Sequence, residues 1–377
     1  MKNVTTFFQL VAKTPDWGFD LSQQIAIALT NKGHHVVTIF LNGPYRKNVA
    51  DRYPGETIFP RLNHKKPLWR LGAAYILFRL CRQYRFSTVI SHHYKPSSLM
   101  AFVDRLYPVE RLFMINHNPG NLRRPARVMV LKTLFSSRWS YVGVSEWVRR
   151  DFLEKAAFLP HERMHVLYNC LDIEAVVNEQ LERNVARKHL NIDQGYFVFG
   201  NIHRLDPSKG HDYMIIAFSH VAEKMPDAHL VIIGGGDRKQ WLENLAEKHG
   251  VGGRVHLTGV LPNASRYTKA FDVFVAPSLH EGFGLGLLEG MAAILPTITS
   301  TGGAFTEVVA DTGLQFPPGD KNKLAERMLQ IYNMPAEART NMGHASYKRL
   351  EDKFSKDIYH KNVIALFDSL ERNSSET

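Results

Sequence analysis

The sequence predicts an α/β protein built from two doubly wound parallel-sheet domains in tandem. The chain has 377 residues, 44% of them hydrophobic, which is more than one hydrophobic core usually organises. Short apolar segments alternate along it with segments of helical periodicity, a pattern typical of parallel sheets covered by helices. The alternation stops once and restarts. We therefore expect two such domains facing each other across a cleft, with ligands bound at the carboxyl ends of the strands.

The first series of strands and helices occupies the amino-terminal half of the chain. Apolar residues recur at helical spacing from Leu21 to Asn31, and Gly33 follows as a helix stop. A helix placed between two apolar strands predicts a strand–helix–strand unit, whose two strands run parallel. The strands expected in this half are Val4 to Phe8, Val36 to Phe40, Thr88 to Ser91, Leu112 to Ile115 and Tyr141 to Val144.

A polar, charge-rich stretch from Asp172 to Gln194 marks the domain junction, and the pattern then restarts. Helices are expected at His211 to Lys224 and Arg238 to His249. The expected strands are Phe197 to Asn201, Leu230 to Gly234, Val255 to Thr258, Val273 to Ala276 and Thr297 to Thr299. These patterns predict an N-terminal domain over residues 1–185, a C-terminal domain over 186–355, and a terminal helix within 356–377 that packs back on the first domain.

The net charge of +11 is unevenly distributed. Residues 1–150 hold 23 Lys and Arg against 7 Asp and Glu, whereas residues 151–377 hold 24 against 29. Basic and apolar residues are mixed from Asn63 to Phe86 and from Asn121 to Trp139, as in faces that dock on anionic membranes; helices with apolar cores and solvated cations explain each segment equally well. The first half therefore predicts an anionic partner, which could be acidic phospholipid, a phosphorylated carrier or nucleic acid.

Cysteine usage and hydropathy indicate the compartment. Cys81 and Cys170 are the only cysteines, too few for a disulfide framework or a zinc site. The amino terminus lacks the apolar stretch and cleavage site of a signal peptide, and no segment reaches the roughly 18 apolar residues of a membrane span. We expect a cytoplasmic protein, with peripheral attachment to the cytoplasmic face of the membrane as an open alternative.

The segment from Glu281 to Glu289 carries the clearest candidate site. Three glycines within five positions follow an apolar strand and precede a helical pattern, so the backbone approaches a ligand closely and then begins a helix. The N–H groups and dipole at a helix start suit a diphosphate. The carboxylates of Glu281 and Glu289 can each accept two hydrogen bonds, which fits the vicinal hydroxyls of a sugar and a ribose. An ordinary strand-to-helix turn with two solvated glutamates is the competing interpretation.

A second cluster follows the first strand of the second series. Arg204 and Lys209 lie in the run Arg-Leu-Asp-Pro-Ser-Lys-Gly, at the carboxyl end of a strand. Two cations at that edge can neutralise a leaving diphosphate. Either cation alone would as readily be a surface residue near a turn, but the two clusters together predict a phosphate site.

These two clusters make the chain resemble the retaining glycosyltransferases of the GT-B fold known as family 4, or glycosyl transferases group 1. The family's RLxxxKG pattern appears from Arg204 to Gly210, and its ExxxxxxxE pattern appears from Glu281 to Glu289. Supporting matches are Val144 to Val148, Tyr168 to Asp172, Gly234 to Gly236, and Gly302-Gly303 followed by Glu307. The resemblance covers nearly the whole chain and is most specific from about Phe197 to Val309.

The resemblance implies a role for each matching residue. Arg204 and Lys209 are similar to the diphosphate ligands, Glu281 to the carboxylate that binds donor-sugar hydroxyls, and Glu289 to the ribose-binding glutamate. The residues implied to contact the donor through backbone or base are Gly259, Val260, Leu261, Gly282, Phe283, Gly284 and Leu285. In the first domain, Gly18 is the candidate for the family's glycine loop and His117 for its sugar-facing histidine. Trp17-Gly18-Phe19 departs from the family's paired glycines, and His92 and His93 also end a strand.

The function implied is transfer of a sugar, with retained configuration, from a nucleotide diphosphate sugar to a saccharide or lipid-linked saccharide. Such transfers build cell-surface polysaccharide and lipopolysaccharide. No Asp-x-Asp motif lies near the site and two cations are present, so we expect a metal-independent enzyme without a cofactor, whose nucleotide base is undetermined. A GT-B nucleotide-sugar epimerase or phosphorylase is the nearest alternative. A basic nucleic-acid-binding protein is a second, less favoured one, and a non-catalytic sugar-binding relative is a third. Nucleic acid is not expected as a partner, because a nucleic-acid-binding protein would leave both glutamates without a purpose.

Overall fold

The chain folds into two compact units, each with its own parallel sheet. The computed structural model describes residues 5–12, 20–43, 45–60, 62 and 68–372. The first unit comprises Met1–Asn169 together with Lys356–Thr377, and the second comprises Cys170–Ser355. No helix in the described part of the chain combines the length and the apolar character needed to cross a lipid bilayer.

The first unit contains a seven-stranded sheet in which every adjacent pair is parallel, in the order β3-β2-β1-β4-β5-β6-β7. Successive strands add outward from β1 in one direction and then, from β4, in the other. The carboxyl ends of β1 and β4 therefore flank the point where a doubly wound sheet binds ligands. The strands are β1 (Thr6–Val11), β2 (His35–Phe40), β3 (Glu56–Ile58), β4 (Thr88–His92), β5 (Arg111–Asn116), β6 (Trp139–Gly143) and β7 (Met164–Val166).

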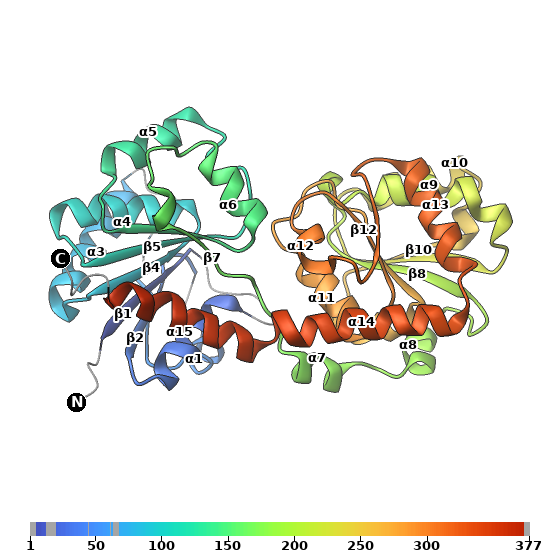
Figure 1. Ribbon diagram of the computed structural model, residues 1–377, viewed down its shortest axis with the longest axis horizontal. Coiled ribbons are helices and arrows are strands. Elements are labelled where there is room, and N and C mark those ends of the chain that lie inside the picture. Colours follow the sequence, from blue (N-terminus) through green and yellow to red (C-terminus); the bar gives the residue numbers. More distant parts are fainter. Residues whose placement is uncertain (1–4, 13–19, 44, 61, 63–67, 373–377) are drawn as a thin grey trace. The chain divides into compact units, whose positions relative to one another are not determined.

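Helices cover both faces of the first sheet, and the last helix of the chain is one of them (Figure 1). In α15, Phe367 packs edge-on against Phe7 at 5.7 Å and Phe113 at 4.6 Å between ring centroids. His360 and Gln24 of α1 approach to 2.9 Å. The helices of this unit are α1 (Leu21–Asn31), α2 (Lys47–Ala50), α3 (Trp69–Tyr84), α4 (Tyr94–Leu106), α5 (Pro125–Leu134), α6 (Glu146–Leu153), η1 (His161–Arg163) and α15 (Lys356–Arg372).

The second unit has a six-stranded sheet with the same winding, in the order β10-β9-β8-β11-β12-β13. All five pairs are parallel, so the point where the strand order reverses lies between β8 and β11. The strands are β8 (Phe197–Ile202), β9 (Ala228–Ile233), β10 (Val255–Gly259), β11 (Val273–Ala276), β12 (Thr297–Ser300) and β13 (Leu314–Phe316).

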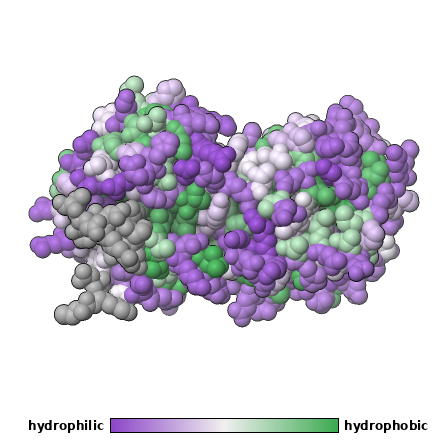
Figure 2. Space-filling model, viewed as in Figure 1, coloured by the Kyte–Doolittle hydropathy of each residue, from purple (hydrophilic) through white to green (hydrophobic). Residues whose placement is uncertain are grey.

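The helices of the second unit bury one apolar side and leave the other in solvent. In α13 the residues Leu324, Met328 and Ile331 are fully buried at helical spacing, while charged residues occupy the outer side. The visible face of this unit is mostly hydrophilic (Figure 2). The helices are α7 (Ile173–Glu179), α8 (Arg183–His189), η2 (Pro207–Lys209), α9 (His211–Val221), η3 (Ala222–Lys224), α10 (Lys239–Lys248), η4 (Gly252–Arg254), η5 (Ala264–Ala270), α11 (Leu285–Ala292), α12 (Phe305–Val309), α13 (Lys321–Tyr332) and α14 (Ala336–Phe354).

The α/β class with two doubly wound sheets is confirmed. Each of the ten strands expected from the sequence corresponds to a strand of the structure, and the helix expected from Leu21 to Asn31 has those bounds. Three strands were missed, β3, β7 and β13. Each has three residues and lies at an edge of its sheet, where so short a segment provides no periodic signal.

The division between the units falls at Asn169 and Cys170, sixteen residues before the expected end of the first domain at residue 185. The polar stretch that we took as the junction is bound to the second unit. Leu171 forms a bridge with Ser355, and α8 carries two arginines that bind Asp272 beside β11. Polar composition indicated the region of the junction, but these contacts determine where the second unit begins.

Arg187 of α8 anchors this region from inside the second unit. Its side chain is completely buried. The guanidinium binds Asp272 Oδ2 at 2.8 Å and donates to the backbone carbonyls of Asp193, Gln194, Tyr196 and Ala270 at 2.8 to 3.1 Å. Each of the three guanidinium nitrogens thus has at least one acceptor, and a buried charge is tolerated when it is paired and hydrogen-bonded in this way.

We predict that Arg187→Ala destabilises the second unit by about 3 to 5 kcal/mol, because it removes the buried cation that binds Asp272 Oδ2 and donates to four carbonyls. Denaturant unfolding of the two variants would measure this. The matched control is Arg183→Ala, which removes the other arginine bound to Asp272, at 2.7 Å, from a position where 41% of the side chain is exposed. That control should cost less than about 1 kcal/mol. Equal losses for the two variants would contradict the anchoring role.

Candidate functional site

Loops that follow β8, β9, β10 and β11 converge at the carboxyl edge of the second sheet. Four backbone hydrogen bonds tie them together. The N–H of His203 donates to Ile233 at 3.0 Å, Leu205 to Gly235 at 2.9 Å, Gly234 to Gly259 at 2.9 Å, and Leu279 to Ser208 at 2.8 Å. The residues that the sequence places in separate motifs are thereby brought to one edge, at the point where the strand order reverses.

Two glycines allow the loops to approach this closely. Gly210 has φ +70°, and a Cβ there would lie 2.1 Å from the carbonyl oxygen of Pro277. Gly303 has φ +95°, and a Cβ there would lie 2.2 Å from the carbonyl oxygen of Glu281. A side chain at Gly210 would push apart the loops that carry Lys209 and Glu281, and one at Gly303 would push the loop after β12 away from Glu281.

Lys209 and Glu281 form an ion pair across these loops. Lys209 Nζ lies 2.8 Å from Glu281 Oε2, and Lys209 is only 8% exposed. Ser278 Oγ and His203 Nε2 each lie 3.4 Å from the same oxygen. No described residue donates a hydrogen bond to Glu281 Oε1. One carboxylate oxygen therefore fixes the side chain, and the other is available to accept from a ligand.

The surroundings of Glu281 hold it ionised. Burial of the carboxyl favours its neutral form, but the hydrogen bond from His203 and the charge of Lys209 outweigh burial and lower the pKa to about 2. His203 also has a defined proton position. The backbone N–H of Arg204 donates to its Nδ1 at 2.9 Å, so Nε2 carries the hydrogen that faces Glu281.

Arg204 provides a different kind of positive charge. Its side chain is exposed, and its guanidinium makes no ion pair with the described residues. Close by in the fold, α11 begins after Gly284, which has φ +97°. The first N–H groups of a helix have no acceptor within it, so Leu285 and Gly286 present donors there. The structure thus separates the two cations that the sequence grouped, because Lys209 already binds Glu281 and Arg204 is available to an anion.

Glu289 lies within α11, about one turn after the helix begins at Leu285, in an opposite electrostatic setting. No described residue forms a hydrogen bond or ion pair with its carboxylate, and burial alone raises its pKa to about 7. The two glutamates of one motif are therefore distinct acids. Glu281 is a fixed anion, and Glu289 changes its charge near neutral pH.

The remaining predicted residues of this unit divide into framework and surface. Phe283 is 2% exposed and packs edge-on against Phe354, so its side chain belongs to the core. Gly259 has φ +77°, and Val260 beside it is 78% exposed. Val260 therefore offers an apolar surface at the same edge as Arg204. Among the described residues, no group of three His, Cys, Asp or Glu side chains is placed to bind a metal ion.

Three histidines gather at the corresponding edge of the first sheet. His92 ends β4, His93 follows it, and His117 follows β5. His92 Nδ1 and His117 Nε2 are 3.1 Å apart, and the rings of His93 and His117 lie 4.6 Å apart. Burial lowers the pKa of all three, assisted for His92 and His117 by the neighbouring imidazoles. Gly18, the other residue predicted in this unit, lies outside the described residues.

The hydrogen bond between His92 and His117 assigns their tautomers. His92 is 2% exposed, and its Nε2 has no hydrogen-bond partner among the described residues. If His92 carried its proton there, a buried N–H would be unpaired, which is rarer in proteins than an unpaired acceptor. Nδ1 of His92 therefore carries the proton and donates to His117, whose own proton is on Nδ1. His117 can offer that N–H to a ligand.

His93 has a strained backbone. Its φ of +65° and ψ of 164° lie in a region that is essentially restricted to glycine. Strain of this kind, of order 1 to 3 kcal/mol, is found where structure serves a site. It is the described residue of the first unit that departs most from ordinary geometry, and it contacts His117.

Family comparisons agree with this geometry. Residues 182–349 match the family described as glycosyl transferases group 1, and residues 22–175 match the one described as Glycosyltransferase Family 4. The two matches together span most of the chain. The chain belongs to the family 4, group 1 glycosyltransferases.

The chain spans about 60% of the length of the first curated relatives it matches. The chain is 29% identical to a GDP-mannose-dependent mannosyltransferase of Corynebacterium glutamicum that acts on a phosphatidylinositol monomannoside, over 60% of the chain and 61% of that protein. It is 25% identical to an uncharacterised glycosyltransferase of Methanocaldococcus jannaschii over 62% of the chain and 60% of that protein. It is also 25% identical to the O-antigen biosynthesis glycosyltransferase WclY of Escherichia coli, over 72% and 76% of the two chains.

Solved structures confirm the GT-B fold. A glycosyltransferase of Rickettsia africae superposes with a TM-score of 0.82 at 16% identity, over 98% of this chain and all of that one. The HepE protein of Anabaena, in complex with UDP-glucose, superposes with a TM-score of 0.78 at 17% identity, over 97% and 99%. At these identities the likeness establishes the fold alone.

Sequence reasoning missed two contacts of this glycosyltransferase's site. His203 directly precedes Arg204, and Ser278 lies three residues before Glu281, but neither was singled out. Both reach Glu281 Oε2. The position of His203 at the carboxyl end of β8 was the one signal available in the sequence. In the first unit, His92 and His93 were treated as alternatives to His117, whereas the structure places the three together.

We predict that Glu289→Gln gains stability relative to the natural chain as pH rises from 5 to 8. The folded carboxyl has the raised pKa, about 7, so the folded chain binds more protons than the unfolded chain between about pH 4.5 and 7. Stability supplied by the neutral form is present below that window and lost as pH rises through it. A neutral amide avoids this loss, which amounts to about 2 to 3 kcal/mol.

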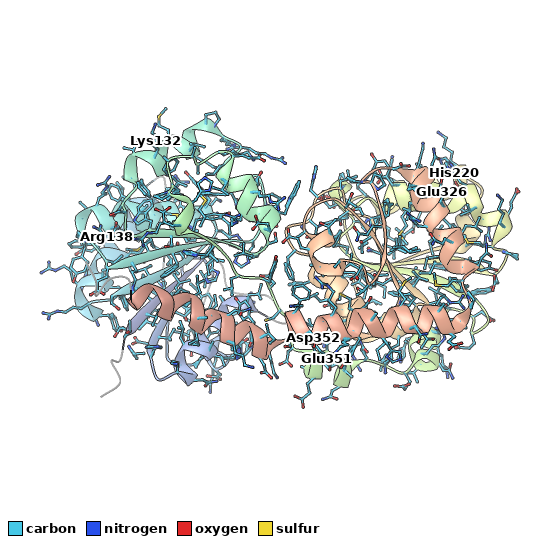
Figure 3. All side chains as sticks on the ribbon, viewed as in Figure 1. Lys132, Arg138, His220, Glu326, Glu351 and Asp352 are labelled. Atoms are coloured by element: carbon cyan, nitrogen blue, oxygen red, sulfur yellow. The ribbon has the colours of Figure 1, made fainter. Side chains whose placement is uncertain are left out.

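Denaturant unfolding at pH 5 and pH 8 checks the prediction. The control is Glu326→Gln on α13, whose side chain is 62% exposed (Figure 3), and a smaller change is expected there. A stability difference between Glu289→Gln and the natural chain that stays constant across this range would mean that the pKa of Glu289 is not raised.

Proposed function

We propose that the protein transfers a sugar from a nucleoside diphosphate sugar to a saccharide or lipid-linked saccharide acceptor, with retention of configuration, in the assembly of cell-surface polysaccharide or lipopolysaccharide. The observation that carries the proposal is Glu281. Lys209, His203 and Ser278 all approach one of its carboxylate oxygens, Oε2. The other oxygen accepts no hydrogen bond from the described residues. This fixed carboxylate has one oxygen free to accept from a sugar hydroxyl. It lies close to N–H groups of Arg204 and α11 that can donate to a phosphate, so the site suits a sugar attached to a diphosphate.

The parts of the donor correspond to different features of the site. The diphosphate would bind the exposed guanidinium of Arg204 and the first N–H groups of α11, which combine charge with a helix dipole. Lys209 has three N–H donors, so it can bind Glu281 and a phosphate oxygen together. Glu289 would accept the ribose hydroxyls, and Val260 with Gly259 would contact the base.

Catalysis in this proposal is chiefly electrostatic. The acceptor hydroxyl attacks the anomeric carbon on the face from which the diphosphate departs. The bond between that carbon and the diphosphate oxygen breaks, and the hydroxyl proton passes to the departing diphosphate. Arg204, Lys209 and the start of α11 stabilise the charge that develops on the leaving group, at no cost of reorganisation because loops and helix already hold them. The role implied for His117 of the first unit would use its Nδ1–H as a hydrogen-bond donor to a ligand.

The relatives support the substrate class at a coarse level. Proteins similar to this chain are described as acting in O-antigen synthesis or with GDP-mannose, and a solved neighbour contains UDP-glucose. Uracil and guanine are thus both represented, so the base, sugar and linkage are left open in the proposal. The basic composition of residues 1–150 favours an anionic acceptor at the cytoplasmic face of the membrane, with the protein attached peripherally.

We predict that at least one of UDP, GDP and ADP, or a sugar conjugate of one, raises the melting temperature at millimolar concentration. Arg204→Ala should weaken that ligand by about tenfold or more, because it removes a charge-assisted phosphate contact. Lys224→Ala is the matched control, since Lys224 is an exposed cation of the same unit in η3, before β9 and away from the site. A panel in which no nucleotide stabilises the protein would overturn the proposed function.

We further predict that turnover needs no divalent metal, because Arg204, Lys209 and the α11 amides supply the positive charge that the leaving diphosphate requires. Activity measured with the donor identified above should be unchanged by EDTA. The control is the same preparation with Mg²⁺ or Mn²⁺ added back. Loss of activity in EDTA that either metal restores would show that a metal shares this task.

A further inference from the structure

An apolar cavity of about 610 Å³ lies in the first unit among α3, α4 and α5. Its walls include Trp69 and Leu71 of α3, Leu99 and Phe102 of α4, and Val130 and Leu134 of α5. Most ligand pockets fall in this range of volume. Leu71, Phe102 and Val130 are 60%, 43% and 42% exposed, so the cavity presents hydrocarbon that water would otherwise cover.

A second cavity, of about 410 Å³, adjoins the first and is lined by positive charge. The two share Arg70, Tyr94, Lys95 and Val130. Arg124, which directly precedes α5, and Arg127 of α5 complete the second one, which makes four cations and no carboxylate in its lining. None of the four forms an ion pair within the described parts of the chain.

The cations are partly positioned by their surroundings. The Arg127 guanidinium lies 4.9 Å from the Tyr94 ring and donates to the carbonyl of Asn121 at 2.9 Å. The surrounding sequence offers few counter-charges. Residues 61–139 contain 15 Lys and Arg and two acids, Asp104 and Glu110. Asp104 is completely buried and bonded to Arg138 and Trp139. The uncompensated field around the cavity therefore attracts an anion.

We propose that these joined cavities bind one phosphate-headed lipid, with its hydrocarbon chain in the apolar cavity and its phosphate among Arg70, Lys95, Arg124 and Arg127. Apolar wall and cationic pocket share an edge, which is the arrangement of chain and head in such an amphiphile. Guanidinium groups bind phosphate oxygens in a bidentate manner, and Lys95 adds a point charge. A zwitterionic head would place its own cation among the four.

The binding site stands on the geometry of the first unit alone. Its identification as the place that holds the lipid end of a lipid-linked acceptor rests on the proposed function. Exposed apolar residues also lie outside the cavities, among them Tyr75 and Met129, and hydrophobic residues are visible on the face near α5 (Figure 2). Adsorption of that whole face to a membrane is the alternative that the experiment has to separate from binding of a single lipid.

The test uses the full chain and a soluble probe, dihexanoyl phosphatidic acid below its micelle concentration, measured by calorimetry. We expect one molecule to bind, and dihexanoyl phosphatidylcholine to bind at least about tenfold more weakly. Lys95→Glu combined with Arg124→Glu should abolish binding. Arg79→Glu combined with Lys132→Glu changes the net charge equally at exposed sites outside both cavities, Lys132 being on the outer side of α5 (Figure 3), and should change affinity less than about threefold.

The apolar wall has its own matched pair. Leu71→Asp places a charge in the cavity, and Leu106→Asp places one on α4 outside it, each at a side chain that is 60% exposed. Only Leu71→Asp should weaken the probe. Equal losses for the two charge-reversed variants or for the two leucine variants, equal affinity for the two lipids, or no binding at all would overturn the proposal. The rise in melting temperature caused by the nucleotide identified above is measured on each variant as well. If the nucleotide still stabilises variants that no longer bind lipid, the lipid proposal and the proposed function are tested separately.

Discussion

Lys209 and Glu281 form an ion pair that is almost removed from water, and the geometry of the candidate site follows from the way it is held. Burying both charges would be unfavourable if either lacked its partner. The partner is supplied by a loop more than 70 residues away, which Gly210 brings against Pro277. Because Ser278 and His203 approach the same oxygen as Lys209, the Glu281 side chain is held in one orientation. Its second oxygen is left to accept a hydrogen bond from a ligand. The ionised state and the orientation thus have one cause.

The hydrophobic periodicity of the sequence predicts most of the strands, and each strand that it misses has a physical reason. Strands of four to six residues buried on both faces leave an apolar run that can be read, whereas β3, β7 and β13 are three-residue edges without one. The junction was placed by polar composition, yet Arg187 shows that a polar segment can be bound by buried charge to the unit that follows it. The motif spacing likewise placed Glu281 and Glu289 near a ligand. It could not show that one is an acid of low pKa and the other of high pKa, because that difference depends on Lys209 and His203 and not on the seven residues between them.

The histidines of the first unit show the same limit in another form. His92, His93 and His117 are 25 residues apart at most, and the sequence offered them as competitors for one role. In the structure they form a cluster in which His92 fixes the proton of His117, and His93 adopts a strained backbone beside it. A single histidine at a strand end has two tautomers of similar energy. Here the buried neighbour His92, which has one unpaired nitrogen, selects between them. His92 therefore sets the proton position of His117 without having to touch the ligand.

Two groups of cations, one in each unit, have opposite electrostatic surroundings. In the second unit, Lys209 is ion-paired with Glu281, and Arg183 and Arg187 are ion-paired with Asp272. These pairs hold the backbone and loops in place. In the first, Arg70, Lys95, Arg124 and Arg127 line a common cavity without a carboxylate. Like charges gathered in one lining repel one another. An anion bound there would offset that repulsion. The phosphate of a lipid, whose chain matches the apolar cavity alongside, meets both requirements at once.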